Sequence, residues 1–569
     1  MAHVPHIASP VSWRVLSPSI QSKIHLRMTL CGGQCFHWHH TPRRTFLGAI
    51  DHCVFELREV HCSAKEVRRR CPRKQGADSA TATVDDSDAV CCWIEYRKLW
   101  PQGSTESSSA QSAPAARQQS SSPSASLPTE TDEEVLTRYL SLDVDLTALW
   151  LRWTDAPTTR QHPLVTHLIR SSEGAARITD DARKSSALLQ ECQHDAGAPA
   201  AMYTPIRHVR QDVHSCLFSF LCSQNNNVAR ITGMIYTLSR HYGDHLCDVQ
   251  LATGAVRPPS AHNVSDSVRG DSRRKIGAGG TFGEAKHQAV RPPSSPSKQS
   301  NEQAAETEWL SVYSFPSLQQ LATASEEELR RMGFGYRGRY VVEAAKTISA
   351  FSLPTSPAGQ MITAIPTLPQ KQHQTCLQTP FYADLLAHHG NLAYQRAQLQ
   401  LLCGVGRKVA DCVLLFSLAH SNLVPVDTHM AQVAVEYLAT AAHVLPQPKN
   451  SSRKRFRHGD EATGVEKGEH FNGKSRAISW QKELLLWGEK AKRLKIKAAK
   501  TTPVKTSKST RKKANSLEPS DQEAAEAAKL PVPPLYARHH DAIQQGFMEL
   551  FGPHAGWAHS VLFYYRMRK

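Results

Sequence analysis

Residues 392–419 place two helical segments on either side of the turn Gly404-Val405-Gly406, and this pattern restricts the fold more than any other stretch. The segments read AYQRAQLQLL and KVADCVLLFSLA, and the two glycines permit positive φ or a close backbone approach. The sequence therefore predicts a helix–hairpin–helix. Exposed amides at such a turn, beside a helix N-terminus, can cradle a phosphate, and Gly404, Gly406 and Val409 are the predicted contacts.

Lys408 stands at the start of the second predicted helix. A helix N-terminus, partial burial and the neighbouring Arg407 each disfavour the charged form of an amine. A neutral amine is needed when lysine acts as a nucleophile. The alternative is an ordinary first-turn lysine that faces solvent.

Asp427 precedes another apolar-periodic helix in VPVDTHMAQVAVEYL. It is a good N-cap, and a capping carboxylate can also face a cleft and stabilise a developing sugar cation. Cys412 and Phe416 lie one and two turns beyond Lys408 on the same helix face. They are predicted to floor a flat apolar pocket, or else to be core residues.

Composition narrows the class of protein. The 569 residues carry a net charge of +17 at a pI of about 9.3, which indicates a polyanionic partner, most simply nucleic acid. No apolar run is long enough for a membrane span. The fourteen cysteines include no C-x-x-C pair and none follows Cys412, so no metal site and no cofactor are predicted.

Polar, low-complexity segments divide the chain into blocks. The predicted class is α+β: a mostly helical core with an N-terminal antiparallel β domain and long disordered inserts. The β domain covers 1–130, with inserts at about 63–90 and 102–130. A helical domain over 131–443 holds the helix–hairpin–helix at about 392–419 and an insert at about 252–306. A basic insert over 444–530 then precedes a C-terminal helical part over 531–569.

The basic insert has eleven Lys or Arg and no Asp or Glu between Lys490 and Lys513. It is a solvated loop, a nuclear import signal or a phosphate-binding arm. The first acidic residue of the chain is Asp51. The stretch before it, which has basic but no acidic residues, weakly resembles an organelle leader. No secretory signal peptide is expected. The predicted location is the nucleus, with a mitochondrial fraction.

The stretch LLCGVGRKVADCVLLFSLAHSNLVPVDTHM resembles the signature of DNA base-excision glycosylases, and more specifically the eukaryotic 8-oxoguanine DNA glycosylase/AP lyase family. The resemblance continues in order through MTLCGGQCFHW, CLFSFLCSQNNNVARITGM, FPSLQQLA, GFGYRGRYV and LFGPHAGWAHSVLF. It covers the ordered blocks and breaks only at the inserts.

The resemblance implies a mechanism. Lys408 attacks C1′ of the damaged nucleotide and forms a Schiff base, and β-elimination then nicks the strand, while Asp427 assists. The flipped base stacks between Cys412 and Phe563, and His429 holds a phosphate or the lesion. The carbonyl of Gly33 accepts the N7 hydrogen that guanine lacks.

The resemblance also implies contacts to the opposite strand. Asn225 fills the hole left by the flipped base, Tyr336 wedges the stack, and Arg230 and Arg337 read the estranged cytosine. The simpler alternatives are a turn residue for Asn225, a hairpin glycine for Gly33, core aromatics for Tyr336 and Phe563, and exposed charges for the arginines.

The chain departs from the family pattern at two positions. His559 replaces the glutamine that reads the Watson–Crick edge of the lesion, and Cys403 replaces a proline. A protonated imidazole would lose its acceptor, so excision is expected to fall as pH drops through the pKa of the histidine, which is near 6.5 if the ring is unperturbed.

The sequence therefore predicts a monomeric, bifunctional 8-oxoguanine glycosylase/lyase that acts on double-stranded DNA without a membrane partner. Two alternatives stay open: a glycosylase of shifted purine-lesion specificity, and a non-catalytic helix–hairpin–helix DNA-binding protein. The pair of Lys408 and Asp427 disfavours a non-catalytic DNA-binding protein, because DNA binding alone needs neither residue.

Overall fold

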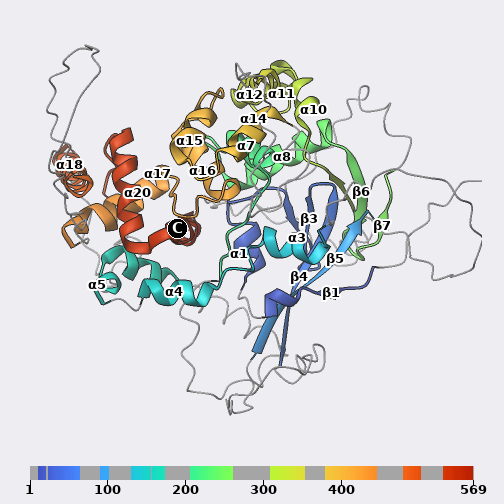
Figure 1. The fold of residues 1–569 in the computed structure, drawn as a ribbon, viewed down its shortest axis with the longest axis horizontal. Coiled ribbons are helices and arrows are strands. Elements are labelled where there is room, and N and C mark those ends of the chain that lie inside the picture. The colour runs from blue at the N-terminus through green and yellow to red at the C-terminus, as the bar shows by residue number, and fades with distance from the viewer. Residues whose placement is uncertain are drawn as a thin grey trace, which may run out of the picture. The chain divides into compact units, whose positions relative to one another are not determined.

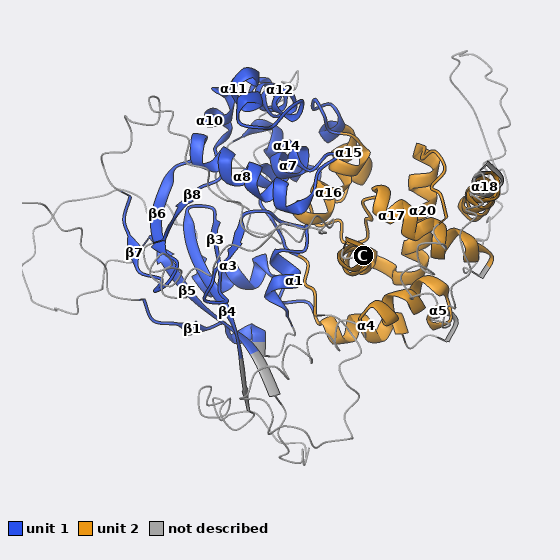
Figure 2. Ribbon diagram, turned by 180° about the vertical axis from the view of Figure 1, so that it is seen from behind, with its two compact units in different colours: residues 1–144, 209–388, 398–405 blue, residues 145–208, 389–397, 406–569 orange. Residues whose placement is uncertain are grey.

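A computed structural model describes residues 11–20, 24–63, 90–101, 130–154, 157–172, 205–259, 308–352, 379–444, 479–501 and 530–567. The chain divides into two compact units (Figure 2). Unit 1 comprises residues 1–144, 209–388 and 398–405, and unit 2 comprises 145–208, 389–397 and 406–569.

Unit 1 contains a five-stranded antiparallel sheet in the order β1-β5-β4-β3-β2 (Figure 1). Its strands are β1 (Arg14–Val15), β2 (Trp38–His40), β3 (Phe46–Ile50), β4 (Cys53–Ser63) and β5 (Val90–Trp100). The helices η1 (Ser17–Ile20), α1 (Leu26–Leu30) and α3 (Asp132–Tyr139) accompany this sheet. The predicted α+β class with an N-terminal antiparallel sheet is confirmed.

The five-stranded sheet is buried on both faces. Alternate residues point to opposite sides of a strand, so Phe55 and Leu57 pack in one cluster with α1 and α3, while Val54 packs in another. Leu47 and Leu99 join Val54 on that second side. This double burial explains why β3 to β5 have apolar residues on both faces.

The second cluster is completed by a three-stranded sheet, β7-β6-β8, within the region predicted as helical. Its strands are β6 (His245–Gln250), β7 (Val256–Arg257) and β8 (Trp309–Tyr313). The insert predicted from 252 therefore starts too early, since β7 pairs with β6. The sequence gives little sign of β8, because its partner β6 precedes it by about sixty residues.

The remaining helices of unit 1 are short and mostly capped by side chains. They are α7 (Val213–Cys222), α8 (Val228–Tyr242), α10 (Leu318–Ala322), α11 (Glu326–Arg331), α12 (Arg337–Ala350) and α14 (Pro380–Ala387). Asn227 caps α8 as predicted, with Oδ1 accepting from the Arg230 amide at 2.9 Å. Ser325 caps α11, but Glu328 does not return the expected second bond and accepts from the Tyr242 hydroxyl instead.

The regular structure of unit 2 is entirely helical among its described residues. It contains α4 (Leu146–Thr154), α5 (Pro157–Arg160), α16 (Arg407–Ser417), α17 (Thr428–Val433), η3 (Ala434–Leu438), η4 (Ala439–Val444), α18 (Trp480–Thr501), α20 (Ala537–Phe551), η5 (Gly552–His554) and α21 (Ala555–Met567). The last helix before the turn, α15 (Leu392–Gln400), lies partly in each unit.

Helix α18 corrects the prediction of an insert over 444–530. Leu484, Trp487 and Ala491 are at most 2% exposed, and α18 packs against α20 and η4. Figures 1 and 2 show α18 beside α20. A 3.6-residue period of apolar side chains within a basic segment is the signal that could have revealed this helix.

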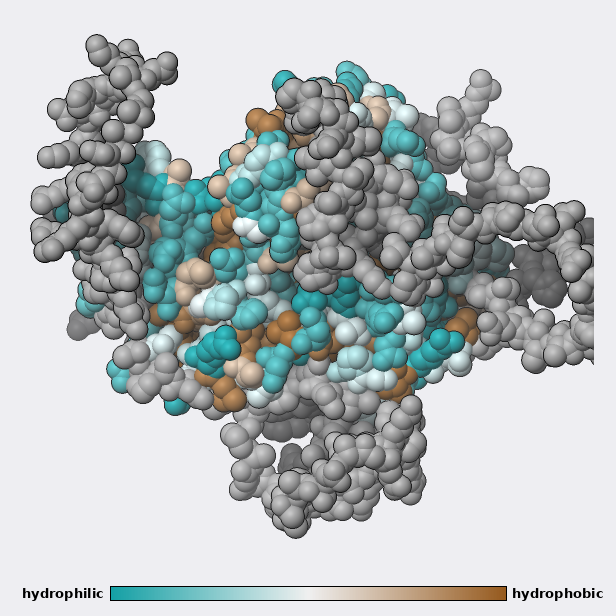
Figure 3. Space-filling view, viewed as in Figure 1, coloured by the Kyte–Doolittle hydropathy of each residue, from teal (hydrophilic) through white to brown (hydrophobic). Residues whose placement is uncertain are grey.

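The other predicted inserts fall largely outside the described residues, and the predicted domain boundaries stay predictions. On the face shown in Figure 3, hydrophilic and apolar residues are interspersed. Among the described helices, none combines the length and apolar character that crossing a lipid bilayer would require.

Candidate functional site

The turn between α15 and α16 requires glycine at 404. Gly404 has φ of +81°, and a Cβ there would lie 2.4 Å from Cγ of Tyr340. Gln224 Nε2 donates to the Gly404 carbonyl at 2.9 Å. Gly406 caps α16 with φ of −80° and has open space around it, so its backbone can be approached from outside.

The predicted nucleophile, Lys408, lies in the first turn of α16 and is half-buried. Its side chain hydrogen-bonds the Cys412 thiol one turn later. Burial raises the pKa of Cys412 to about 11, against the lowering effect of Lys408. Cys412 therefore stays a neutral thiol, 2% exposed, beside an amine.

Asp427 caps α17 as predicted, because its Oδ1 accepts from the Met430 amide at 2.9 Å. The carboxylate also raises the pKa of Cys412 and that of His559, after the larger effect of burial on each. Asp427 thus lies in one electrostatic neighbourhood with Lys408. The capping interpretation is confirmed, and a carboxylate that faces a cleft stays a prediction.

His559 is 6% exposed and stacks on Phe563, with ring centroids 5.8 Å apart. Burial lowers the pKa of His559 to about 4, and Asp427 and the Pro425 carbonyl only partly oppose this. The midpoint near 6.5 that an unperturbed ring would have therefore does not apply, because burial keeps the ring neutral well below that pH. Its Nδ1 is buried without a hydrogen-bond partner.

Phe563 and His429 border the same group of side chains. Phe563 is half-buried, and exposed His429 meets it edge-on at 6.1 Å. We call the set the lysine cluster: Lys408, Cys412, Asp427, His429, His559 and Phe563. Unit 2 thus gathers the predicted nucleophile, its acid partner and the predicted base-stacking residues.

Phe416 is a core residue. It is 4% exposed, and its ring packs on that of His208 at 4.7 Å. His208 also contacts Trp557 at 5.5 Å. In this structure Phe416 is therefore a core residue, as the second interpretation of the sequence expected. Its place in the floor of an apolar base pocket stays a prediction.

Sequence reasoning missed a buried ion network beneath the lysine helix. Asp411 is fully buried and accepts from Arg396 Nε at 2.7 Å and from Gln544 Nε2 at 2.8 Å. Arg407 lies 3.7 Å from Asp411 and 2.5 Å from Asp541. The positive charge of Arg407 was expected to disfavour a charge on Lys408, but the carboxylates of Asp411 and Asp541 compensate the charge of Arg407. The Arg407–Asp411 spacing of four residues was the available signal.

Unit 1 gathers the four residues predicted to contact the opposite strand. Asn225 adopts a left-handed conformation, with φ of 45°, at the end of the loop after α7. Arg337 is 3% exposed, and it donates through Nε to Gln224 O at 2.9 Å and through an Nη to Asn225 O at 2.8 Å. Arg337 therefore holds this loop in shape.

Two more residues complete this loop cluster. Tyr336 is 44% exposed, and its hydroxyl donates to Gln224 O at 3.2 Å. Arg230 is exposed and donates to Gly333 O at 3.1 Å. The core alternative does not suit Tyr336, which presents much of its ring to solvent.

Gly33 has φ of 91° in the connection between α1 and β2. Its neighbour Gln34 donates to Thr29 O at 2.9 Å and accepts from the Val209 amide at 3.0 Å. Gln211 donates to the Gln34 carbonyl at 2.7 Å. The backbone around Gly33 is therefore fixed from both sides.

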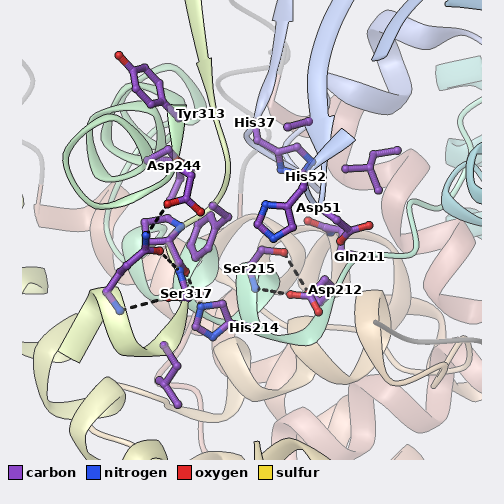
Figure 4. A pocket seen from close by; sticks show the side chains of 18 of the residues that line it. His37, Asp51, His52, Gln211, Asp212, His214, Ser215, Asp244, Tyr313 and Ser317 are labelled. Carbon is purple, nitrogen blue, oxygen red and sulfur yellow. Dashed lines mark hydrogen bonds between the residues drawn. The ribbon is translucent and has the colours of Figure 1, made fainter. Parts of the chain in front are cut away.

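A cavity of about 500 Å³ lies elsewhere in unit 1 (Figure 4). None of the predicted site residues is among the described residues that line it. Two of its polar side chains already have partners: His214 bonds Tyr382 and Pro316, and Asp212 caps α7. In the described part of the chain, no group of three or more His, Cys, Asp or Glu side chains could hold a metal ion.

The comparisons with known proteins agree with the resemblance. Residues 18–217 match the family model "8-oxoguanine DNA glycosylase, N-terminal domain". Over this segment the chain is similar to 8-oxoguanine DNA glycosylases. The matched segment includes Gly33 but ends before Lys408.

Two curated glycosylases are similar over part of the chain. The N-glycosylase/DNA lyase OGG1 of Arabidopsis thaliana is 28% identical over 232 residues, which is 41% of this chain and 40% of that protein. The N-glycosylase/DNA lyase of Saccharomyces cerevisiae is 27% identical over 230 residues, 40% of this chain and 41% of that protein. The chain thus matches well under half the length of each relative.

Solved glycosylase structures show a weaker likeness. Clostridium acetobutylicum 8-oxoguanine glycosylase/lyase, in complex with double-stranded DNA containing cytosine opposite 8-oxoG, is 14% identical at a TM-score of 0.36, over 95% of this chain and 91% of that one. MBOgg1 in complex with a low-affinity DNA ligand is 14% identical at 0.38, over 99% of both chains. Neither score assigns the fold by itself.

Proposed function

We propose that this protein is a bifunctional DNA glycosylase that flips 8-oxoguanine out of duplex DNA, excises it and then cleaves the strand. One observation carries the proposal: the amine of Lys408 lies half-buried against the neutral Cys412 thiol, in the same cluster as Asp427. A protein that only binds DNA has no use for a lysine in this setting.

The chemistry follows from the residue types. The neutral amine of Lys408 attacks C1′ as the glycosidic bond breaks, and the base leaves with a proton. The sugar ring then opens to a protonated Schiff base. Loss of a C2′ proton expels the 3′ phosphate and nicks the strand. Asp427 stabilises the positive charge that develops on the sugar.

The remaining assignments are part of the same proposal. Cys412 and Phe563 sandwich the flipped base, the Gly33 carbonyl accepts from its N7 hydrogen, and His429 holds the lesion or a phosphate. The loop cluster of Asn225, Arg230, Tyr336 and Arg337 fills the stack opposite and reads cytosine, with Arg337 using N–H groups beyond those that hold the loop. Gly404, Gly406 and Val409 form a phosphate-binding hairpin.

A shifted purine-lesion specificity is the second candidate, and His559 favours it. The unpartnered Nδ1 of a buried, neutral ring can pair with only one group on the edge of a base. The amide of a glutamine can donate and accept at once. Lesions that present a different edge would then compete with 8-oxoguanine.

The test is a set of duplexes that carry 8-oxoguanine opposite each of the four bases, incubated with and without borohydride. Lys408→Gln should abolish base release and the trapped adduct while DNA binding persists. Lys346→Gln, an exposed lysine of α12 paired with Glu343, is the matched control and should behave as wild type. A trapped adduct formed by Lys408→Gln at the wild-type rate would assign the chemistry to another amine.

We also propose that the protein acts as a monomer on double-stranded DNA, in the nucleus with a mitochondrial fraction. The basic segment 490–513 supports the nuclear part. Cell fractionation of the tagged full-length protein would decide the location.

A further inference from the structure

The basic segment of unit 2 forms an ordered helix with two distinct faces. The inward face of α18 carries Leu484, Trp487 and Ala491, which are buried against α20 and η4. The opposite face carries a stripe at helical spacing, which we call the α18 stripe: Lys482, Leu486, Lys490, Arg493 and Lys497. All five residues of the stripe are exposed.

Contacts on the inward side hold α18 in place. Glu483 accepts from Arg538 Nε at 2.6 Å and lies 3.1 Å from His539 Nε2. The Trp487 ring stacks on that of His539, with centroids 5.5 Å apart. The stripe is therefore presented by a fixed helix and not by a loop.

Helix α20 connects α18 to the helix of the lysine cluster. Gln544 of α20 donates to Asp411 of α16 and to the Val424 carbonyl at 3.0 Å. Asp541, one turn before, pairs with Arg407. The stripe thus has a fixed position within unit 2 relative to Lys408.

The charge on the outward side is strongly positive. Glu489 is the exposed acid of this part of α18, and Lys492 pairs with it at 3.0 Å. Lys482 and Lys497 lie about 22 Å apart along the axis, at ~1.5 Å per residue. That length matches roughly six base pairs of duplex DNA at ~3.4 Å each.

We infer that the α18 stripe is a second DNA-backbone contact, which binds phosphates of one strand away from the excised base. The inference rests on the proposed function. The broad inward face of α18 is already buried, so the helix cannot enter the major groove fully and lies along the phosphates instead. A lipid surface fits less well, because membrane-surface helices need a broad exposed apolar face, and here the apolar face is inside.

The experiment compares wild type with the triple variant Lys482→Gln, Lys490→Gln and Arg493→Gln in the full chain. Affinity for an undamaged duplex is measured by fluorescence anisotropy as a function of salt. Three lost phosphate contacts should lower the slope of log K against log salt by about 2.7. Between about 50 and 200 mM salt, wild type should then lose about 40-fold more affinity than the variant.

The matched control has the same charge change at exposed arginines of other helices in unit 2: Arg152→Gln, Arg160→Gln and Arg170→Gln. It should keep the wild-type slope. Equal slopes for wild type and the stripe variant would overturn the inference. So would an equal loss in the control, since net charge alone would explain it.

Two further measurements separate the remaining outcomes. Single-turnover excision by the stripe variant at saturating enzyme should match wild type, because the lysine cluster is untouched. A wild-type protein that excises no 8-oxoguanine refutes the proposed function, whereas an unchanged salt slope with normal excision refutes only the stripe. Loss of binding to phosphatidylserine vesicles with an unchanged DNA slope would assign the stripe to a membrane and refute DNA as its partner.

Discussion

Replacing Asp411 by alanine should destabilise unit 2 by about 3 kcal/mol, since breaking a buried ion pair costs about 3–5 kcal/mol. The lower end applies because the arginine partners are 16% and 18% exposed and regain some water. Burial raises the pKa of Asp411, and Arg396 and Arg407 oppose this. The carboxylate itself therefore contributes little net free energy, and the loss comes mainly from leaving Arg396 without its acceptor, since Gln544 keeps its bond to the Val424 carbonyl.

The matched control is Asp541→Ala. Asp541 pairs with the same Arg407 at 2.5 Å, but its side chain is 66% exposed. An exposed pair contributes about 0–1 kcal/mol, so the two substitutions should differ by at least about 2 kcal/mol. Both variants remove one carboxylate from Arg407, so the difference reports the burial of Asp411 together with its bonds to Arg396 and Gln544.

Urea unfolding followed by tryptophan fluorescence measures both variants. A cost below about 1 kcal/mol for Asp411→Ala, or a cost equal to that of Asp541→Ala, would refute the reasoning. Asp411→Asn adds a functional readout. It should slow excision but still form the borohydride-trapped adduct, because Asp411 positions the lysine helix and does not touch the substrate.

The remaining predictions concern His559 and Gly404. Burial lowers the pKa of His559 to about 4, so the folded ring stays neutral where the unfolded chain, at about 6.5, takes up a proton. The contribution of the neutral His559 ring to the free energy of unfolding is fully present above about pH 6.5 and falls by at most about 3 kcal/mol towards pH 4. His559→Gln should remove this pH-dependent loss of stability in unfolding measurements. Excision by wild type and His559→Gln should keep parallel profiles between about pH 5.5 and 8; a step near 6.5 in wild type alone would contradict the neutral ring. Gly404→Ala should destabilise by about 1–2 kcal/mol or more, from positive φ alone and from the clash with Tyr340, whereas Gly406→Ala, at negative φ and in open space, should cost less than about 1 kcal/mol. Similar urea midpoints for these two variants would contradict the geometry of the turn.

Local features were readable from the sequence because they depend on neighbours a few residues away. Asn227 and Asp427 cap their helices through bonds to the third residue onward, and both were predicted. The turn at Gly404 and the shared face of Lys408 and Cys412 follow from the same short-range geometry.

Contacts between distant segments were decided only by the tertiary structure. Nothing local shows that Arg337 would be buried against the carbonyls of Gln224 and Asn225, or that Asp411 would meet Gln544. His559 looked like an ordinary titrating histidine until its burial lowered its pKa. Burial sets the free energy of a charge, and burial is a property of the packed chain, which a local pattern of residues does not contain.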